Sequence, residues 1–97
     1  MIVGVPKETK VHEYRVGLVP SSAAELVKEG HKVLVEANAG AGMGASNLDY
    51  ERVGAQVVTT AEEVFSRADM VVKVKEPQKN EWKLLQKDQI LFTYLHL

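Results

Sequence analysis

The chain has 97 residues, enough for one small domain at most. Hydrophobic residues make up 45% and charged residues 26%, a balance that excludes an intrinsically disordered chain. The net charge of −1, with no basic cluster, argues against nucleic acid and anionic membranes as partners, and the lack of cysteine excludes disulfides. No apolar stretch suggests a signal peptide or a membrane span, so we expect a cytoplasmic protein.

Short apolar runs alternate with helical segments along the chain. Two helices begin with the spacing of a capping box, one with Ser22 as N-cap and Glu25 three residues on, the other with Thr60 and Glu63. Gly30 is the expected stop of the first helix. Shorter helices are expected at residues 49–53 and 81–85. Five strands are predicted, at residues 2–5, 31–36 and 56–58, within 69–77, and at 90–94.

This alternation predicts an α/β fold with a doubly wound, mainly parallel sheet that helices cover on both faces. With right-handed crossovers, the sheet grows outward from the first strand to the second and third, then returns to add the fourth and fifth. The predicted strand order is therefore 3-2-1-4-5, with a switch point between the first and fourth strands. Ligands of such sheets bind beyond the carboxyl ends of the strands, at the switch point.

The stretch 69–77 contains the strand around which the rest is organised. Lys73 and Lys75 lie two apart and share one face of that strand, and Pro77 ends it. We expect Lys73 to extend to water as the strand ends. Lys75 lies at the very end of the strand. Its side chain could likewise extend to water, or it could bind a ligand.

Three residues follow strand ends near the predicted switch point: Arg15, Lys75 and His96. An arginine and a lysine suit a small carboxylate, and an imidazole suits proton transfer near neutral pH. Each residue alone is more simply explained as a solvated surface group. Their shared position on the sheet is what favours a functional site. The three histidines of the chain lack the spacing of metal ligands, so no metal is expected.

The glycine-rich stretch 40–45 matches G-x-G-x-x-A, the dinucleotide-binding fingerprint. A dinucleotide site needs a full helix after this motif, and Gly54 leaves room for only a stub. The acidic residue expected about 20 positions on falls at Glu62 and Glu63, which begin a helix instead of ending a strand. The sequence therefore predicts a tight turn here, not a cofactor site.

Six motifs stand out along the chain: VGVPKE at 3–8, EYRV at 13–16, GHKVLVE at 30–36, AGAGMGA at 39–45, VKVKEP at 72–77 and LFTYLHL at 91–97. Together they resemble bacterial alanine dehydrogenase, in the alanine dehydrogenase/transhydrogenase alpha family. The match covers essentially the whole chain but only the first part of that family's subunit. It implies that residues 1–97 are a truncated N-terminal catalytic, substrate-binding domain, flavodoxin-like and similar to the catalytic domain of formate and glycerate dehydrogenases. The NAD-binding Rossmann domain of the family is not present in this chain.

The same resemblance implies reversible NAD-dependent oxidative deamination of L-alanine to pyruvate and ammonia. Arg15 and Lys75 would bind the substrate oxygens, and His96 would be the catalytic acid/base. NAD would be bound mainly by the absent domain, and the subunits would form a homo-oligomer, a hexamer by resemblance. One alternative is the NAD-binding component of proton-translocating transhydrogenase, which is less similar at KVKEP and TYLHL. The other is an inactive structural fragment.

Overall fold

The computed structural model describes residues 1–94. Its five strands form one parallel sheet in the order β3-β2-β1-β4-β5, so the predicted order is confirmed. This order differs from the 2-1-3-4-5 of flavodoxin, and the flavodoxin-like subclass is therefore not confirmed. The strands are β1 (Ile2–Val5), β2 (Lys32–Glu36), β3 (Gln56–Val58), β4 (Met70–Lys73) and β5 (Ile90–Thr93).

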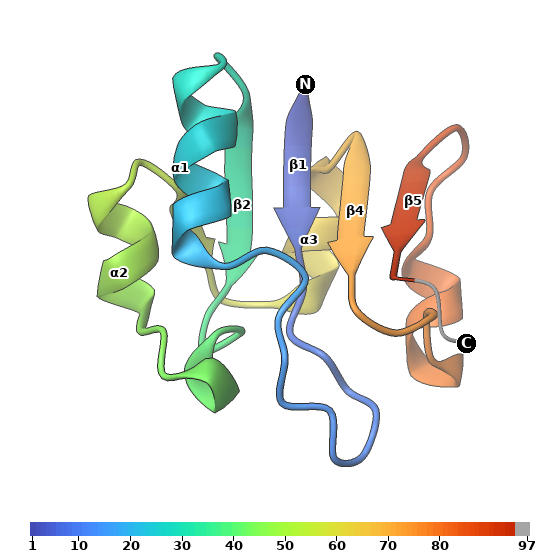
Figure 1. Cartoon of the computed structure of the whole chain (residues 1–97). Helices are drawn as coiled ribbons and strands as arrows, with labels where there is room; N and C mark the ends of the chain where they lie inside the picture. Colours follow the sequence, from blue (N-terminus) through green and yellow to red (C-terminus); the bar gives the residue numbers. More distant parts are fainter. Residues whose placement is uncertain (95–97) are drawn as a thin grey trace.

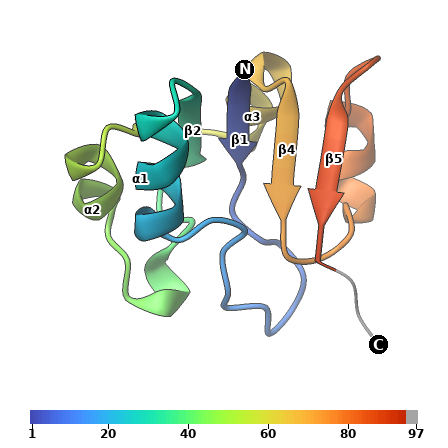
Figure 2. The same cartoon turned by 45° about the horizontal axis from the view of Figure 1, so that its top comes forward.

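Helices lie on both faces of this sheet (Figures 1 and 2). One face is covered by α1 and α2, which pack against β2 and β3, and the other by α3, which packs against β1 and β2. The longest described helix has nine residues, and no helix within residues 1–94 is long and apolar enough to cross a bilayer. The helices are α1 (Pro20–Lys28), α2 (Asn47–Arg52) and α3 (Ala61–Arg67), with 3-10 turns η1 (Ala41–Met43) and η2 (Lys79–Leu84).

The alternation of side chains along β2 divides the core between the two helical layers. Val33 and Val35 pack on one side, in a cluster that also contains Tyr50 of α2. Leu34 points to the opposite side and packs with Val64 of α3. All three β2 residues are almost fully buried, as expected for a parallel strand covered on both faces.

The predicted start of the first helix at Ser22 is wrong. Helix α1 begins at Pro20, with Val19 as an N-cap that makes no side-chain hydrogen bond. Proline fits the first helical position, because its φ is preset and its missing N–H would have no partner there. The expected stop is confirmed, since Gly30 follows the helix with a φ of 93°.

The later helix starts show one correct cap and one that the sequence reading missed. Oγ1 of Thr60 accepts a hydrogen bond from the backbone N–H of Glu63 at 3.2 Å, as the spacing predicted. Helix α2 begins earlier than expected, because Ser46 and Asp49 form a reciprocal capping box. The Ser-x-x-Asp spacing was present in the sequence and identifies this helix start.

The prediction that Lys73 extends to water is wrong. Its side chain is 0% exposed, and Nζ lies 3.1 Å from Oε1 of Glu8 and 3.3 Å from Oε1 of Glu81. The two glutamates come from the segments that follow β1 and β4, and both are buried. A buried ammonium is tolerated here because carboxylates from two other segments reach it.

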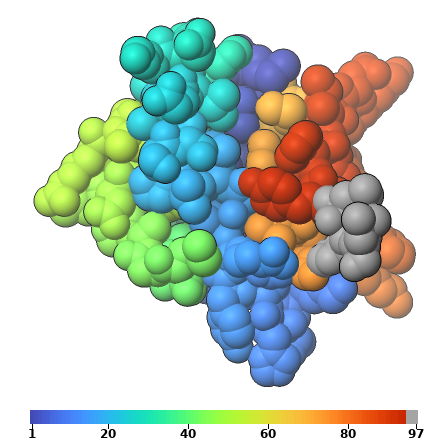
Figure 3. Space-filling view, in the orientation of Figure 1, coloured from blue at the N-terminus to red at the C-terminus, as the bar shows by residue number. Residues whose placement is uncertain are grey.

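The edge strand β5 is the least covered part of the sheet. Its apolar residues Ile90, Leu91 and Phe92 are all exposed, at 50%, 40% and 51%. The red atoms of this strand lie open on the face shown in Figure 3. The sheet therefore ends in an apolar edge within the described residues.

Candidate functional site

The site is built by the long loop that connects β1 to α1. In Figure 1 this blue loop extends past the carboxyl ends of β1 and β4, where the switch point was predicted. Gly17 lets the loop cross β4 closely, because an added Cβ would lie 2.4 Å from the carbonyl oxygen of Val72. The hydroxyl of Tyr94 donates a hydrogen bond to the carbonyl of Gly17 at 2.7 Å. The end of β5 is thereby tied to the same loop.

Glu8 attaches the start of this loop to the end of β4. Its Oε2 accepts a hydrogen bond from the N–H of Val74 at 3.0 Å, and its Oε1 accepts one from the N–H of Lys75 at 3.2 Å. The same Oε1 pairs with Nζ of Lys73. The chain direction at Lys75 is therefore set by a buried carboxylate 67 positions earlier in the sequence.

Arg15 and Lys75, two of the three predicted site residues, meet at one carboxylate. Oε1 of Glu13 lies 3.0 Å from Nη2 of Arg15 and 3.8 Å from Nζ of Lys75. The other oxygen of Glu13 accepts hydrogen bonds from Nε and from the backbone N–H of Arg15, at 3.0 and 2.9 Å. The third predicted residue, His96, lies outside the residues that the structure describes.

The charge state of Glu13 between Arg15 and Lys75 follows from these contacts. The hydrogen bond from the Arg15 side chain is the main cause that lowers the pKa of Glu13 to about 2, helped by the charge of Lys75 and opposed by burial. Glu13 is thus ionised near neutral pH. Two cations and one carboxylate leave a net charge of +1, which suits a single small carboxylate ligand.

A pocket of about 350 Å³ opens at this point. Lys10, His12, Glu13, Arg15 and Lys75 line it, so most of its wall comes from the β1–α1 loop. This volume lies at the lower end of the range for small-molecule sites. It leaves ample room for a small carboxylate ligand.

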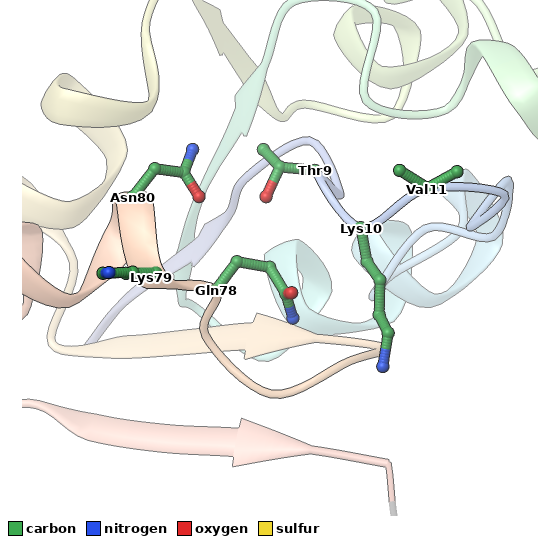
Figure 4. A pocket seen from close by; sticks show the side chains of 6 residues that line it. All are labelled: Thr9, Lys10, Val11, Gln78, Lys79 and Asn80. Atoms are coloured by element: carbon green, nitrogen blue, oxygen red, sulfur yellow. The ribbon is translucent and has the colours of Figure 1, made fainter.

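A larger hollow of about 700 Å³ lies beside this pocket. Figure 4 shows its lining, in which residues of the loop face those of the segment after β4. Lys10 and Val11 are common to the two, but Arg15 and Lys75 do not line the larger one. Of these two pockets, the smaller one is therefore the better candidate for binding a carboxylate, because Arg15 and Lys75 line it.

The glycine-rich loop packs against the site and leads into only a short helix. A Cβ on Gly42 would lie 2.5 Å from the carbonyl oxygen of Tyr14, next to Arg15. The helix that follows, α2, has only six residues, as the predicted stub requires. The residues present do not fit a pyrophosphate site, which needs a longer helix N-terminus. Within residues 1–94, no His, Cys, Asp and Glu side chains cluster in a way that could hold a metal ion.

Glu8 and Glu13 are the site residues that sequence reasoning missed. Glu8 lies three residues after the end of the first strand, near the carboxyl edge of the sheet, and this position is a usable signal. Glu13 stands two residues before Arg15, but nothing in that spacing predicts that it also reaches Lys75.

Comparison with known proteins identifies the family. Residues 4–97 match the family described as "Alanine dehydrogenase/PNT, N-terminal domain". The chain is 47% identical to the alanine dehydrogenase of Mycolicibacterium smegmatis and 48% identical to that of Bacillus subtilis, over 100% of its own length. It spans only 26% and 25% of these relatives, about a quarter of their length.

Solved structures agree with this assignment. An L-alanine dehydrogenase superimposes with a TM-score of 0.94 at 57% identity, covering 99% of this chain and 26% of that one. A transhydrogenase from Sinorhizobium meliloti superimposes with a TM-score of 0.90 at 30% identity, covering 98% of this chain and 27% of that one. The chain therefore belongs to the alanine dehydrogenase/PNT N-terminal domain family.

Proposed function

We propose that this chain is the N-terminal, substrate-binding part of the catalytic domain of an L-alanine dehydrogenase. The proposed reaction is the reversible oxidative deamination of L-alanine to pyruvate and ammonia. The observation that carries the proposal is the convergence of Arg15 and Lys75 on one carboxylate, at the carboxyl edge of the sheet. Such an arrangement is suited to a substrate with a carboxylate and a neighbouring carbonyl oxygen.

Each residue has a distinct proposed role. The guanidinium of Arg15 binds the substrate carboxylate, and its 58% exposed side chain is accessible to a ligand. The ammonium of Lys75 binds the carbonyl oxygen and stabilises the charge that develops there. His96 moves protons as the general acid/base. NAD, held mainly by a Rossmann domain elsewhere in the full-length protein, would be the hydride acceptor.

The proposal also covers assembly and location. By resemblance, the full-length protein is a homo-oligomer, a hexamer, in the cytoplasm. The exposed apolar edge of β5 is consistent with burial against another surface.

A transhydrogenase component is the second candidate. It is supported by the superposition with the Sinorhizobium meliloti protein, at 30% identity. The named alanine dehydrogenases are more similar, at 47–50% identity over the whole chain. This difference favours the dehydrogenase.

The test is an activity assay on the purified full-length protein that carries this chain. We expect L-alanine to drive NADH formation, and pyruvate with ammonia to drive NADH oxidation. Residues 1–97 alone should neither catalyse this reaction nor bind NAD in calorimetry, since the glycine-rich loop does not fit a pyrophosphate. Hydride transfer between nicotinamide nucleotides without any response to alanine would instead identify a transhydrogenase. Alanine-dependent NADH formation by the fragment alone would contradict the proposal that NAD is bound mainly by a separate domain.

A further inference from the structure

The carboxylate of Glu13 has no place in the proposed chemistry, although it touches both cations of the pocket. Its side chain is 5% exposed, while Arg15 is 58% and Lys75 18% exposed. It receives three hydrogen bonds from Arg15, through Nε, Nη2 and the backbone N–H. A buried carboxylate that is bound this closely restricts the motion of an otherwise exposed arginine.

The geometry of the guanidinium decides whether Glu13 competes with a ligand or assists it. A planar guanidinium can bind carboxylates along two edges, one formed by Nε and Nη2 and the other by Nη1 and Nη2. Glu13 occupies the Nε/Nη2 edge. The end edge, which includes Nη1, consequently points away from Glu13 and can receive a second carboxylate.

Lys75 is connected to the same point. Oε1 of Glu13, which accepts from Nη2 of Arg15, is also the oxygen nearest to Nζ of Lys75, at 3.8 Å. Glu13 thus bridges two cations that would otherwise repel each other at close range. With the bridge in place, both can face one small anion.

We propose that Glu13 is a positioning residue that orients Arg15 and holds Lys75 beside it, so that both cations bind one small monocarboxylate substrate. This inference rests on the proposed function. Glu13 itself is not expected to touch the substrate. Its effect should therefore depend entirely on Arg15 and Lys75.

The test compares variants of the full-length protein. Glu13→Gln removes the negative charge at nearly constant size. We expect it to raise KM for pyruvate and the pyruvate Kd about 10- to 100-fold. KM for NADH should stay unchanged. Glu13→Asp keeps the charge and should recover part of the affinity. Glu25→Gln, on the exposed surface of α1, is the matched control and should change neither constant.

A double-mutant cycle shows whether Glu13 acts through Arg15. In an Arg15→Ala background, Glu13→Gln should have much less effect on pyruvate binding than in the parent protein. An equal effect in both backgrounds would overturn the proposal, as would tighter pyruvate binding by Glu13→Gln, which would make Glu13 a competitor. If Glu13→Gln fails to fold, the same cycle is run with Glu13→Asp.

Binding and turnover separate this inference from the proposed function. If the unmodified protein neither binds pyruvate nor oxidises alanine, the proposed function has failed. If the unmodified protein binds pyruvate and oxidises alanine, and Glu13→Gln and Glu13→Asp do so equally well, only the proposed role of Glu13 is wrong.

Discussion

Nζ of Lys73 lies 3.1 Å from Oε1 of Glu8, and the two side chains are 0% and 2% exposed. Oε1 of Glu81 lies 3.3 Å from the same ammonium. This buried triad joins the end of β4 to the loop that carries the site, since Glu8 also accepts from the backbone of Lys75. The position of the pocket thus depends on charges in the core.

Removing the central cation should be strongly destabilising. Lys73→Met would leave Glu8 and Glu81 as buried carboxylates without a counter-ion, a change that costs about 3–5 kcal/mol. The free energy of unfolding, measured by urea denaturation of the full-length protein, should fall accordingly. Lys83→Met, at an exposed position, is the control and should have little effect. An equal loss in the two variants would show that the triad is not a stabilising element.

Glu81→Gln should be milder than Lys73→Met. Within the described residues, Oε2 of Glu81 is buried without a hydrogen-bond partner, so this carboxylate is incompletely satisfied. The substitution keeps an oxygen for Lys73 and for the N–H of Gln78, and it brings the triad from −1 to neutral. A greater loss than in Lys73→Met, in the same denaturation experiment, would contradict this interpretation.

Arg15 and Lys75 should be distinguishable by steady-state kinetics of the full-length protein. Arg15→Ala should mainly raise KM for alanine and pyruvate, because it removes carboxylate binding. Lys75→Ala should lower kcat as well, because the carbonyl oxygen gains charge in the transition state. KM for NADH should change little in either variant, and Lys28→Ala on α1 is the control. Identical effects on kcat and KM in both variants would remove the distinction.

His96 is expected to carry protons and not to bind the substrate. His96→Ala should reduce kcat by roughly 10²–10⁴-fold, leave the pyruvate Kd nearly unchanged and flatten one limb of the pH profile. Kinetics across a pH series would measure both effects. Near-normal turnover with the original pH dependence would mean that the acid/base lies elsewhere in the protein.

Gly42 should matter for substrate affinity, not for cofactor binding. In Gly42→Ala, the new methyl group would meet the carbonyl of Tyr14 at 2.5 Å and push the site loop, so we expect KM for pyruvate to rise. Gly44→Ala is the matched control. Its φ of 76° makes alanine strained there, but no atom lies within 4 Å, so it should lower Tm without a change in KM. A rise in KM for NADH in Gly42→Ala would instead support a cofactor role for this loop.

Acid should remove the stabilisation that Glu13 provides. Its pKa is lowered from 4.5 to about 2 in the folded protein, so the folded state favours the carboxylate. A group with a lowered pKa stabilises fully above its unfolded pKa and loses this effect as the pH falls through the folded value. The Tm difference between the parent protein and Glu13→Gln should be constant above about pH 4.5 and shrink toward pH 2. A difference that stays constant down to pH 2 would mean that charge is not its source.

The sheet could be derived from the sequence because its signals are local. Apolar runs such as residues 2–5 and 56–58, separated by helical segments, identify buried parallel strands without knowledge of their partners. The handedness of crossovers then leaves few topologies, and the observed order is the predicted one. The same logic brought Arg15 and Lys75 to one edge, because parallel strands end on the same side of a sheet.

Only the tertiary structure decided what the charged residues do. Lys73 and Lys75 have the same sequence signature, two lysines on one strand face, but one is enclosed and the other lines a pocket. The difference arises because Glu8, 65 positions before Lys73, folds over the end of β4. Likewise, Glu13 bridges Arg15 and Lys75 only because the loop folds back on the strand. Burial of a charge depends on which distant groups arrive beside it, and no local pattern encodes that.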